Sequence, residues 1–302
     1  MSTHRDAALV LAALAAAAAV PALGSDYWTG LAITVLMWVA LAQSWSVFSG
    51  LSGYVSFGHV VFYGLGAYLV VASWDRLPPA LSVPLAALAA AAFALAIGAP
   101  VLRVRGPYFV ILSFGVAELV KFVVIAVEAA AGNASRLILR TPEIDAIFYA
   151  MLALAAAATA LAWGARVTRL GQGLRAIRED EVAAETLGVP AARYKLAALA
   201  LSAAIPGAVG GTMAMRATYF EPLQAFDPMV SFTMIATAVI GGSDDVRGPV
   251  LGALLLVLLS ELLWAGAPQL YMVVLGVLVV VFVLYLPDGL CGRLPAARAP
   301  RA

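Results

Sequence analysis

Long runs of apolar residues, separated by short polar segments, make up most of the chain. A helix that crosses a bilayer needs about 20 mostly apolar residues, whereas the strands of a membrane barrel alternate apolar and polar positions over about ten residues. The runs here are continuously apolar, so they predict an all-α, polytopic transmembrane helical bundle of about ten spans. The predicted spans are 7–23, 28–48, 56–73, 80–100, 107–127, 146–165, 192–215, 229–242, 249–265 and 270–286. The glycine- and serine-rich segment 49–58 indicates a broken or re-entrant helix.

The amino-acid composition agrees with a protein that lies in a lipid bilayer. Only 12% of the 302 residues are charged and 64% are hydrophobic, whereas soluble globular domains carry about 25% charged residues. The formal net charge is +1 and the cationic residues are dispersed over the loops, so we expect no nucleic-acid partner. Cys291 is the single cysteine, which rules out a disulfide within the chain and a multi-cysteine metal site.

The distribution of lysine and arginine predicts the orientation, because cytoplasmic loops are enriched in both. With the N-terminus inside, most of the 18 cationic residues fall on the inner side. The outer loops keep Arg76, Arg136, Arg140 and Arg216. We therefore expect a multi-pass protein of the inner (cytoplasmic) membrane, with both termini, including the tail 288–302, in the cytoplasm. Residues 1–24 also resemble a signal peptide, although Asp6 argues against cleavage.

The most polar part of the chain is the segment 174–195, in which we predict a short cytoplasmic helix over 174–188. Leu174, Ile177 and Glu181 fall on one side of this helix, and Gly188 can adopt the left-handed conformation that ends it. Three interpretations stay open: an interfacial helix that lies on lipid headgroups, a solvated loop, or a docking element for a cytoplasmic protein. Its several acidic residues count against contact with anionic lipid.

The same segment contains a short motif. Glu181, Ala183, Ala184 and Gly188 match the E-x-A-A-x-x-x-G core of the coupling loop in permeases of ATP-binding cassette (ABC) importers. This motif alone is short, and other segments along the chain are more specific. The segments that carry the resemblance, in chain order, are GLSGYVSFGHVVFYGLGAY (50–68), RGPYFVILSFGVAELVKF (105–122), GLRAIREDEVAAETLGV (173–189) and VIGGSDDVRGPVLGA (239–253).

Together these segments resemble the branched-chain amino acid permease family of ABC transporters, the LivM-like branch, over residues 28–287. The resemblance implies a single transmembrane permease domain over 1–302, with its coupling loop at about 168–191. It also implies partners, namely a second homologous permease subunit, two cytoplasmic ATPase subunits and an extracytoplasmic substrate-binding protein, besides the membrane lipid. The implied activity is uptake of leucine, isoleucine and valine or related compounds.

Two alternatives to that activity stay open. The segment 131–145 departs from the family pattern, and we expect this outer loop to face the binding protein. Within the family, uptake of urea or short-chain amides is the first alternative, because permeases for those compounds look much like this chain. A rival of a different class is a secondary transporter driven by an ion gradient, with Glu118 or His59 as the proton carrier.

The energy source is expected to lie on another polypeptide. The chain lacks the G-x-x-x-x-G-K-[ST] loop that binds nucleotide phosphates. We therefore predict no cofactor on this chain, with ATP and Mg²⁺ bound by the partner ATPase subunits. The glycine-containing segment 241–248 is predicted to be a tight cytoplasmic turn, with Asp244, Asp245 and Arg247 solvated.

Ionisable residues inside the membrane are costly, so each carries a functional hypothesis. His59 is either a neutral imidazole bonded to a neighbouring helix or a part of the substrate path. Glu118 and Lys121 are three residues apart on one helix face, so they form either a structural ion pair or part of the path. Glu261, near the outer end of its span, is expected to be solvated. His4 and His59 make no metal pair, and no catalytic set can be assigned, so we predict a transport subunit and not an enzyme.

Overall fold

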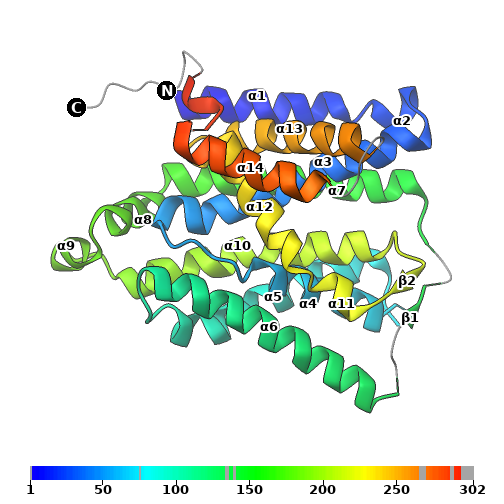
Figure 1. Ribbon diagram of the computed structural model, residues 1–302, viewed down its shortest axis with the longest axis horizontal. Coiled ribbons are helices and arrows are strands. Elements are labelled where there is room, and N and C mark those ends of the chain that lie inside the picture. Colours follow the sequence, from blue (N-terminus) through cyan, green and yellow to red (C-terminus); the bar gives the residue numbers. More distant parts are fainter. Residues whose placement is uncertain are drawn as a thin grey trace.

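The computed structural model describes residues 2–74, 76–132, 136–138, 141–264, 270–285 and 289–293. Its long helices run side by side along the longest axis of the molecule (Figure 1). The helices are α1 Ser2–Ala17, α2 Val20–Leu23, α3 Asp26–Trp45, α4 His59–Ala72, α5 Pro79–Val101, α6 Pro107–Ala130, α7 Ile144–Val167, α8 Arg169–Glu179, α9 Glu181–Thr186, α10 Ala191–Ala214, α11 Pro222–Ala225, α12 Pro228–Gly241, α13 Gly248–Trp264 and α14 Leu270–Tyr285. A π-helical turn, Ser46–Gly50, continues α3, and a short 3-10 turn, Cys291–Arg293, follows α14.

The predicted spans coincide with these helices to within a few residues, with two exceptions. The first predicted span is divided between α1 and α2. In the third, 56–73, only the part from His59 onward is helical. Arg140 and most of the tail 288–302 lie outside the described residues.

The described helices differ in whether they are long enough to cross a bilayer. Six segments are long and apolar enough, and they are Asp26–Gly50, Pro79–Val101, Pro107–Ala130, Ile144–Val167, Ala191–Ala214 and Pro222–Gly241. Shorter apolar helices occupy Ala8–Ala22, His59–Ala72 and Gly248–Leu263, and α14 has 16 residues. The all-α bundle is confirmed, whereas the number of about ten spans stays a prediction.

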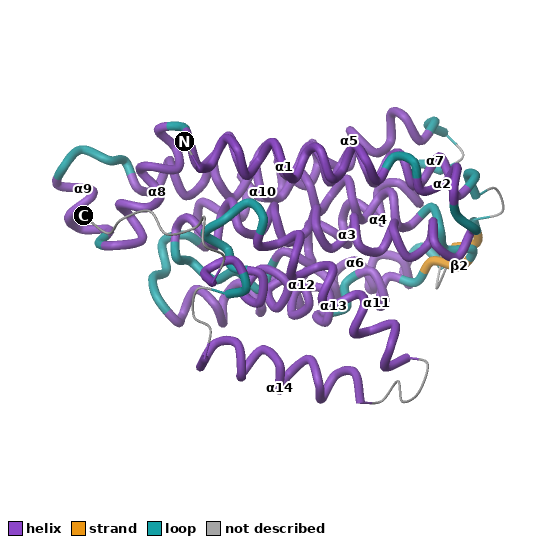
Figure 2. Tube along the Cα trace, turned by 90° about the horizontal axis from the view of Figure 1, so that it is seen from above, coloured by secondary structure: helices purple, strands orange, loops and turns teal. Residues whose placement is uncertain are grey.

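The two ends of the bundle differ. Helices α8 and α9 project from one end, and the N-terminal end of α1 lies at the same end (Figure 1). At the opposite end, strand β1 (Arg136–Leu137) pairs antiparallel with strand β2 (Tyr219–Phe220). We refer to these as the α9 end and the β end. Helix α14 lies at the edge of the bundle (Figure 2), where it packs against α12 and α13.

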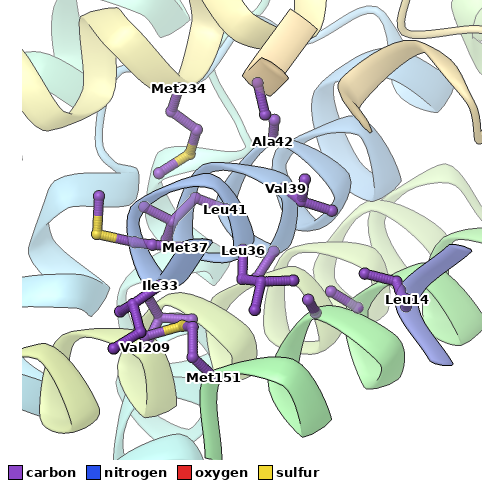
Figure 3. Packing of buried hydrophobic residues seen from close by; sticks show 14 of the residues in the cluster. Leu14, Ile33, Leu36, Met37, Val39, Leu41, Ala42, Met151, Val209 and Met234 are labelled. Carbon is purple, nitrogen blue, oxygen red and sulfur yellow. The ribbon is translucent and has the colours of Figure 1, made fainter. Parts of the chain in front are cut away.

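Helix α3 forms the centre of the largest apolar cluster. Leu36 on α3 packs in this cluster, to which the other helices contribute Leu14 from α1, Met151 from α7, Val209 from α10 and Met234 from α12 (Figure 3). Lipid tails are as apolar as these side chains, so close packing rather than exclusion of water holds such helices together. Helix α3 is therefore the central element of this apolar cluster.

The backbone of α10 packs in close contact with α4 and α5. A Cβ atom at Gly66 of α4 would lie 1.9 Å from the carbonyl oxygen of Gly207 on α10, and one at Gly210 would lie 2.0 Å from the carbonyl oxygen of Tyr63. On the other side, a Cβ at Gly207 would lie 2.5 Å from the Cβ of Ala90 on α5. Small residues are what permit helices to approach this closely in a membrane. The three helices therefore pack as one unit.

The chain leaves the helical conformation between α3 and α4. Residues 53–58 are non-helical and run back beside the end of α3. The indole Nε1 of Trp45 donates to the carbonyl oxygen of Ser56 at 2.9 Å, and the backbone N–H of Ser56 donates to Oγ of Ser49 at 3.2 Å. Irregular backbone in a membrane protein is tolerated where it is buried in protein or lines a water-filled cavity. We call residues 53–58 the helix break.

Candidate functional site

The polar stretch between α7 and α10 folds as two helices, so the prediction of one continuous helix over 174–188 was wrong. Asp180 has φ −156° and ψ 111°, which interrupts the helix. Its carboxylate accepts hydrogen bonds from the backbone N–H groups of Val182 and Ala183, at 2.9 and 3.0 Å. Aspartate is a favoured N-cap because it satisfies donors that the first helical turn leaves unpaired. A new helix, α9, therefore begins directly after α8.

Helix α9 ends as the sequence predicts. Gly188 has φ +86°, the left-handed conformation that favours glycine. The N–H of Val189 returns to the carbonyl oxygen of Ala184 at 3.0 Å, which satisfies a carbonyl of the last turn. The side chain of Ala184 is buried against the bundle, whereas Ala183 is exposed. The motif residues therefore face in different directions.

One side of α9 faces outward and carries exposed apolar side chains. Val182 is 57% exposed and Leu187 is 84% exposed. The other exposed residues around them are Ala183, Glu185 and Thr186. We call these five residues, 182, 183, 185, 186 and 187, the outer face of α9. Its aliphatic side chains, together with the acidic Glu185, suit contact with another protein better than contact with anionic lipid.

Glu181 points the other way, into the bundle. Its Oε1 lies 2.8 Å from Nζ of Lys195 on α10, and 3.3 Å from a guanidinium nitrogen of Arg105 in the α5–α6 turn. The hydroxyl of Tyr54, in the helix break, donates to Oε2 of Glu181. The side chains of Glu181 and Lys195 are only 12% and 3% exposed. We call Glu181, Lys195, Arg105 and Tyr54 the Glu181 cluster; it joins α9 to three other parts of the chain.

The cluster changes how its members titrate. Burial raises the pKa of the Glu181 carboxyl, but the hydrogen bonds from Lys195 and Tyr54 outweigh burial, so the net pKa is lowered. Burial, together with the hydrogen bond to Glu181, raises the pKa of the Tyr54 hydroxyl. Glu181 is therefore ionised and Tyr54 neutral at physiological pH. The sequence motif gave no sign of these partners, since they lie far away along the chain.

Arg178 makes a second connection from the polar helices to the bundle. Its Nη1 donates to the carbonyl oxygen of Gly50, at the end of the π-helical turn, and to Oδ1 of Asp244, at 2.8 and 2.7 Å. Asp244 remains well exposed, as the sequence predicts. The prediction that Asp245 and Arg247 are also solvated was wrong, because they are mostly buried and form a pair with each other at 2.7 Å.

His59 lies at the start of α4, where the helix break ends, and it is fully buried. Its Nδ1 lies 3.0 Å from Oγ of Ser56, and its Nε2 lies 3.2 Å from Oγ of Ser202 on α10. A hydrogen bond to a neighbouring helix was one of the two interpretations from the sequence. The geometry agrees with it, and a role in the substrate path stays a prediction.

Serine hydroxyls from two other helices complete the bonds of the helix break. The N–H of Phe57 donates to Oγ of Ser113 on α6 at 3.1 Å. Ser231 on α12 donates to the carbonyl oxygen of Phe57 at 2.8 Å and accepts from the N–H of Val60 at 3.1 Å. Sequence reasoning missed both serines, since a serine inside an apolar helix often bonds only to its own backbone.

Glu118 and Lys121 form the ion pair that their spacing on α6 predicts. The Lys121 ammonium also lies 5.1 Å from the centre of the Phe122 ring. Lys121 is buried and Glu118 is partly exposed. The two opposite charges neutralise each other on one helix face, and a role in transport stays a prediction. Within the described part of the chain, no three His, Cys, Asp or Glu residues gather in a way that could hold a metal ion.

Comparison with known proteins identifies the family to which the chain is similar. The pattern of the family described as branched-chain amino acid transport system / permease component matches residues 27–283. The high-affinity branched-chain amino acid transport system permease proteins LivM of Salmonella typhimurium (strain LT2) and Escherichia coli (strain K12) are each 29% identical to the chain. Each alignment covers 96% of this chain and 76% of the relative. No solved structure matches the chain.

The family match confirms the resemblance seen in the four sequence segments. It extends over the helix break, the polar helices and the turn at 241–248, which are the regions that the structure brings together at the α9 end. The chain is thus a multi-pass membrane protein and a transport subunit rather than an enzyme. It belongs to the family of branched-chain amino acid transport system permease components.

Proposed function

We propose that the chain is the membrane-spanning permease subunit of an ABC importer that moves leucine, isoleucine and valine, or related compounds, across the cytoplasmic membrane. The family match supports this class of transport, and the two LivM relatives carry the same substrate class in their names. A second homologous permease subunit, two cytoplasmic ATPase subunits and an extracytoplasmic binding protein complete the importer. ATP and Mg²⁺ bind to the ATPase subunits.

The proposed topology has about ten crossings, with both termini and the α9 end in the cytoplasm. The N-terminal end of α1 lies at the α9 end, in agreement with a cytoplasmic N-terminus. Arg169, Arg175 and Arg193 lie exposed at the same end, as expected for a cytoplasmic surface. The shorter helices α1, α4, α13 and α14 supply the crossings beyond the six long segments.

The ATPase docks on the outer face of α9. Leu187 and Val182 are the large exposed apolar side chains of this surface, and burial in a partner of Leu187, which is 84% exposed, contributes about 1.5–3 kcal/mol. Acidic neighbours such as Glu185 add charge that selects a complementary partner. A lipid contact is less suited to this surface, because Glu185 would meet anionic headgroups.

The observation that carries the mechanism is the inward direction of Glu181. The Glu181 cluster ties α9 to α10 and to the helix break, and Arg178 ties α8 to the end of the π-helical turn at Gly50. When ATP draws the two ATPase subunits together, displacement of α9 is transmitted through these bonds to the helix break and to α4. The bundle then switches between inward- and outward-facing states, and the binding protein delivers substrate from outside.

Docking can be tested with Leu187→Asp, with Leu187→Met as the control that keeps an apolar side chain. Because Leu187 is exposed, neither variant should alter folding. We expect Leu187→Asp to abolish co-purification of the ATPase subunits and to lower ATP-driven leucine uptake at least tenfold, while Leu187→Met behaves like wild type. Undiminished co-purification of the ATPase with Leu187→Asp would contradict the docking surface.

Energy source and substrate are tested on the wild-type importer in proteoliposomes. We expect leucine uptake to need ATP and to persist with a protonophore. Uptake that collapses with the protonophore and continues without ATP would establish the secondary transporter instead. Competition by urea or acetamide, with no competition by isoleucine or valine, would establish the amide alternative.

A further inference from the structure

A groove opens at the β end of the bundle, opposite the polar helices. It has a volume of about 350 Å³ and lies between α3, α13 and Arg216, which comes two residues after the end of α10. Binding sites for small molecules are commonly concave, largely apolar, and equipped with a few placed polar groups. None of the residues described so far as part of the α9 end contributes to this groove.

The groove is built on regularly spaced faces of two helices. Gly30, Leu31, Thr34 and Trp38 lie on one side of α3, at the spacing of successive helical turns. From Asp26 at the mouth to Trp38, the rise along α3 is about 18 Å. Leu256, Val257, Ser260 and Glu261 supply the facing wall from α13. The groove therefore extends from the end of the bundle well into its outer half.

Polar groups are concentrated at the mouth, and apolar groups lie deeper. Asp26, Tyr27 and Glu261 are exposed at the mouth, where the Tyr27 hydroxyl donates to Oε1 of Glu261. Further along α3 and α13 the walls become apolar, through Leu31, Trp38, Leu256 and Val257. A ligand that fits this gradient has a charged end and a compact aliphatic end.

Arg216 is the cation of the groove, and within the described part of the chain its guanidinium makes no ion pair and no hydrogen bond. Its guanidinium reaches across to α3, since a Cβ atom built at Gly30 would lie 3.5 Å from Nη2 of Arg216. Partial burial lowers the pKa of Arg216. A guanidinium held in this way can bind a carboxylate through two parallel N–H···O bonds.

We propose that this groove is an outer-side binding site for a zwitterionic aliphatic amino acid, in which Arg216 binds the carboxylate, Glu261 and Asp26 bind the ammonium group, and the apolar walls hold the side chain. This proposal rests on the proposed function and its orientation, which place the groove on the side where the binding protein releases substrate. The presence of both signs of charge at one mouth is the feature that selects a zwitterion over a simple anion or cation.

The test uses the complete importer in proteoliposomes, with radiolabelled leucine and two readouts: uptake, and ATP hydrolysis stimulated by the binding protein. We expect Arg216→Ala to lower leucine uptake at least tenfold while stimulated ATP hydrolysis stays within twofold of wild type. Arg76→Ala is the matched control, because Arg76 is exposed at the same end but does not line the groove. We expect that variant to change uptake less than twofold.

Two results would overturn the site: leucine uptake by Arg216→Ala within twofold of wild type, or an equal loss in Arg76→Ala. Absence of leucine uptake by the wild type would instead refute the proposed function, on which the site depends. Leucine uptake by the wild type thus distinguishes failure of the proposed site from failure of the proposed function.

A second measurement covers the case in which Arg216→Ala does not fold. In the variant Ser260→Cys, leucine should slow labelling of the new thiol by a charged methanethiosulfonate at least threefold. 3-Methylbutylamine, which is leucine without its carboxylate, should give no protection. Cys291 is buried, so the wild type supplies the background labelling. An unchanged labelling rate in the presence of leucine would overturn the proposal.

Discussion

Nζ of Lys195 lies 2.8 Å from Oε1 of Glu181, and this contact joins α10 to the first residue of α9. Both side chains are largely shielded from solvent, so neither charge has water as a ready substitute for its partner. Removing one member of a buried pair leaves the other uncompensated, at a cost of about 3–5 kcal/mol. The contact therefore fixes α9 to the bundle, as the proposed transmission of movement from α9 requires.

Replacing Glu181 by Gln should destabilise the protein. The amide keeps the shape and can still accept from Tyr54, but Lys195 loses its counter-charge in a buried position. We expect the free energy of unfolding to fall by about 3 kcal/mol, measured from the midpoint of denaturant unfolding in detergent. Glu185→Gln is the control, because Glu185 is exposed and its contact with Arg105 is longer, so its effect should stay below about 1 kcal/mol. Equal effects of the two variants would show that the Glu181 cluster has no special role.

The contribution of Glu181 should depend on pH in a defined direction. Its pKa is lowered in the folded protein, so it stabilises the fold above the ordinary carboxyl pKa of about 4.3. That contribution is lost as the pH falls through the lowered pKa. The difference in unfolding free energy between wild type and Glu181→Gln should thus be constant near neutral pH and shrink below about pH 4.3. A difference that grows on acidification would contradict the assignment.

Gly188→Val should impair coupling through the backbone rather than through packing. Gly188 has φ +86°, and an added Cβ would meet no described atom within 4 Å, so the cost is conformational, about 1–3 kcal/mol. We expect α9 to lose its ending and uptake per ATP hydrolysed to fall. Gly164→Val is the matched control, since Gly164 also has no atom within 4 Å of an added Cβ but lies within the regular helix α7. Normal uptake per ATP in Gly188→Val would count against α9 as the coupling element.

Arg178→Ala should uncouple ATP hydrolysis from uptake more than Asp244→Ala does. The arginine variant removes both the bond to the Gly50 carbonyl and the pair with Asp244, whereas the aspartate variant removes only an exposed ion pair, which is worth about 0–1 kcal/mol. We expect uptake per ATP to fall at least fivefold in Arg178→Ala and to change less than twofold in Asp244→Ala. Equal effects of the two variants would show that Arg178 acts through its ion pair with Asp244.

Much of the fold follows from local pattern. Runs of apolar residues predict helices because a bilayer leaves the backbone few alternatives, and the helical segments lie close to where hydropathy places them. Gly188 and the Glu118–Lys121 pair were predictable for the same reason, since a helix ending and an i, i+3 contact depend only on neighbours in the chain.

The partners of the candidate site could not be predicted in this way. Glu181 meets Tyr54 and Arg105, which lie far away in the sequence, so only the packing of the bundle brings them together. The motif around Glu181 indicates a surface loop and gives no hint that its acid turns inward. The break at Asp180 was missed for another reason: helix formers on both sides concealed an N-cap that also fits the sequence.

The contact between α4 and α10 at Gly66 and Gly207 limits how the transporter can move. Helices in such close backbone contact have little room to shift against each other, so we expect α4, α5 and α10 to move together. Helix α6 differs from them, since its outward side presents Ile111, Leu119 and Phe122 to its surroundings. In the transport cycle proposed above, this geometry predicts that α4, α5 and α10 shift as one body relative to α6 when α9 is displaced.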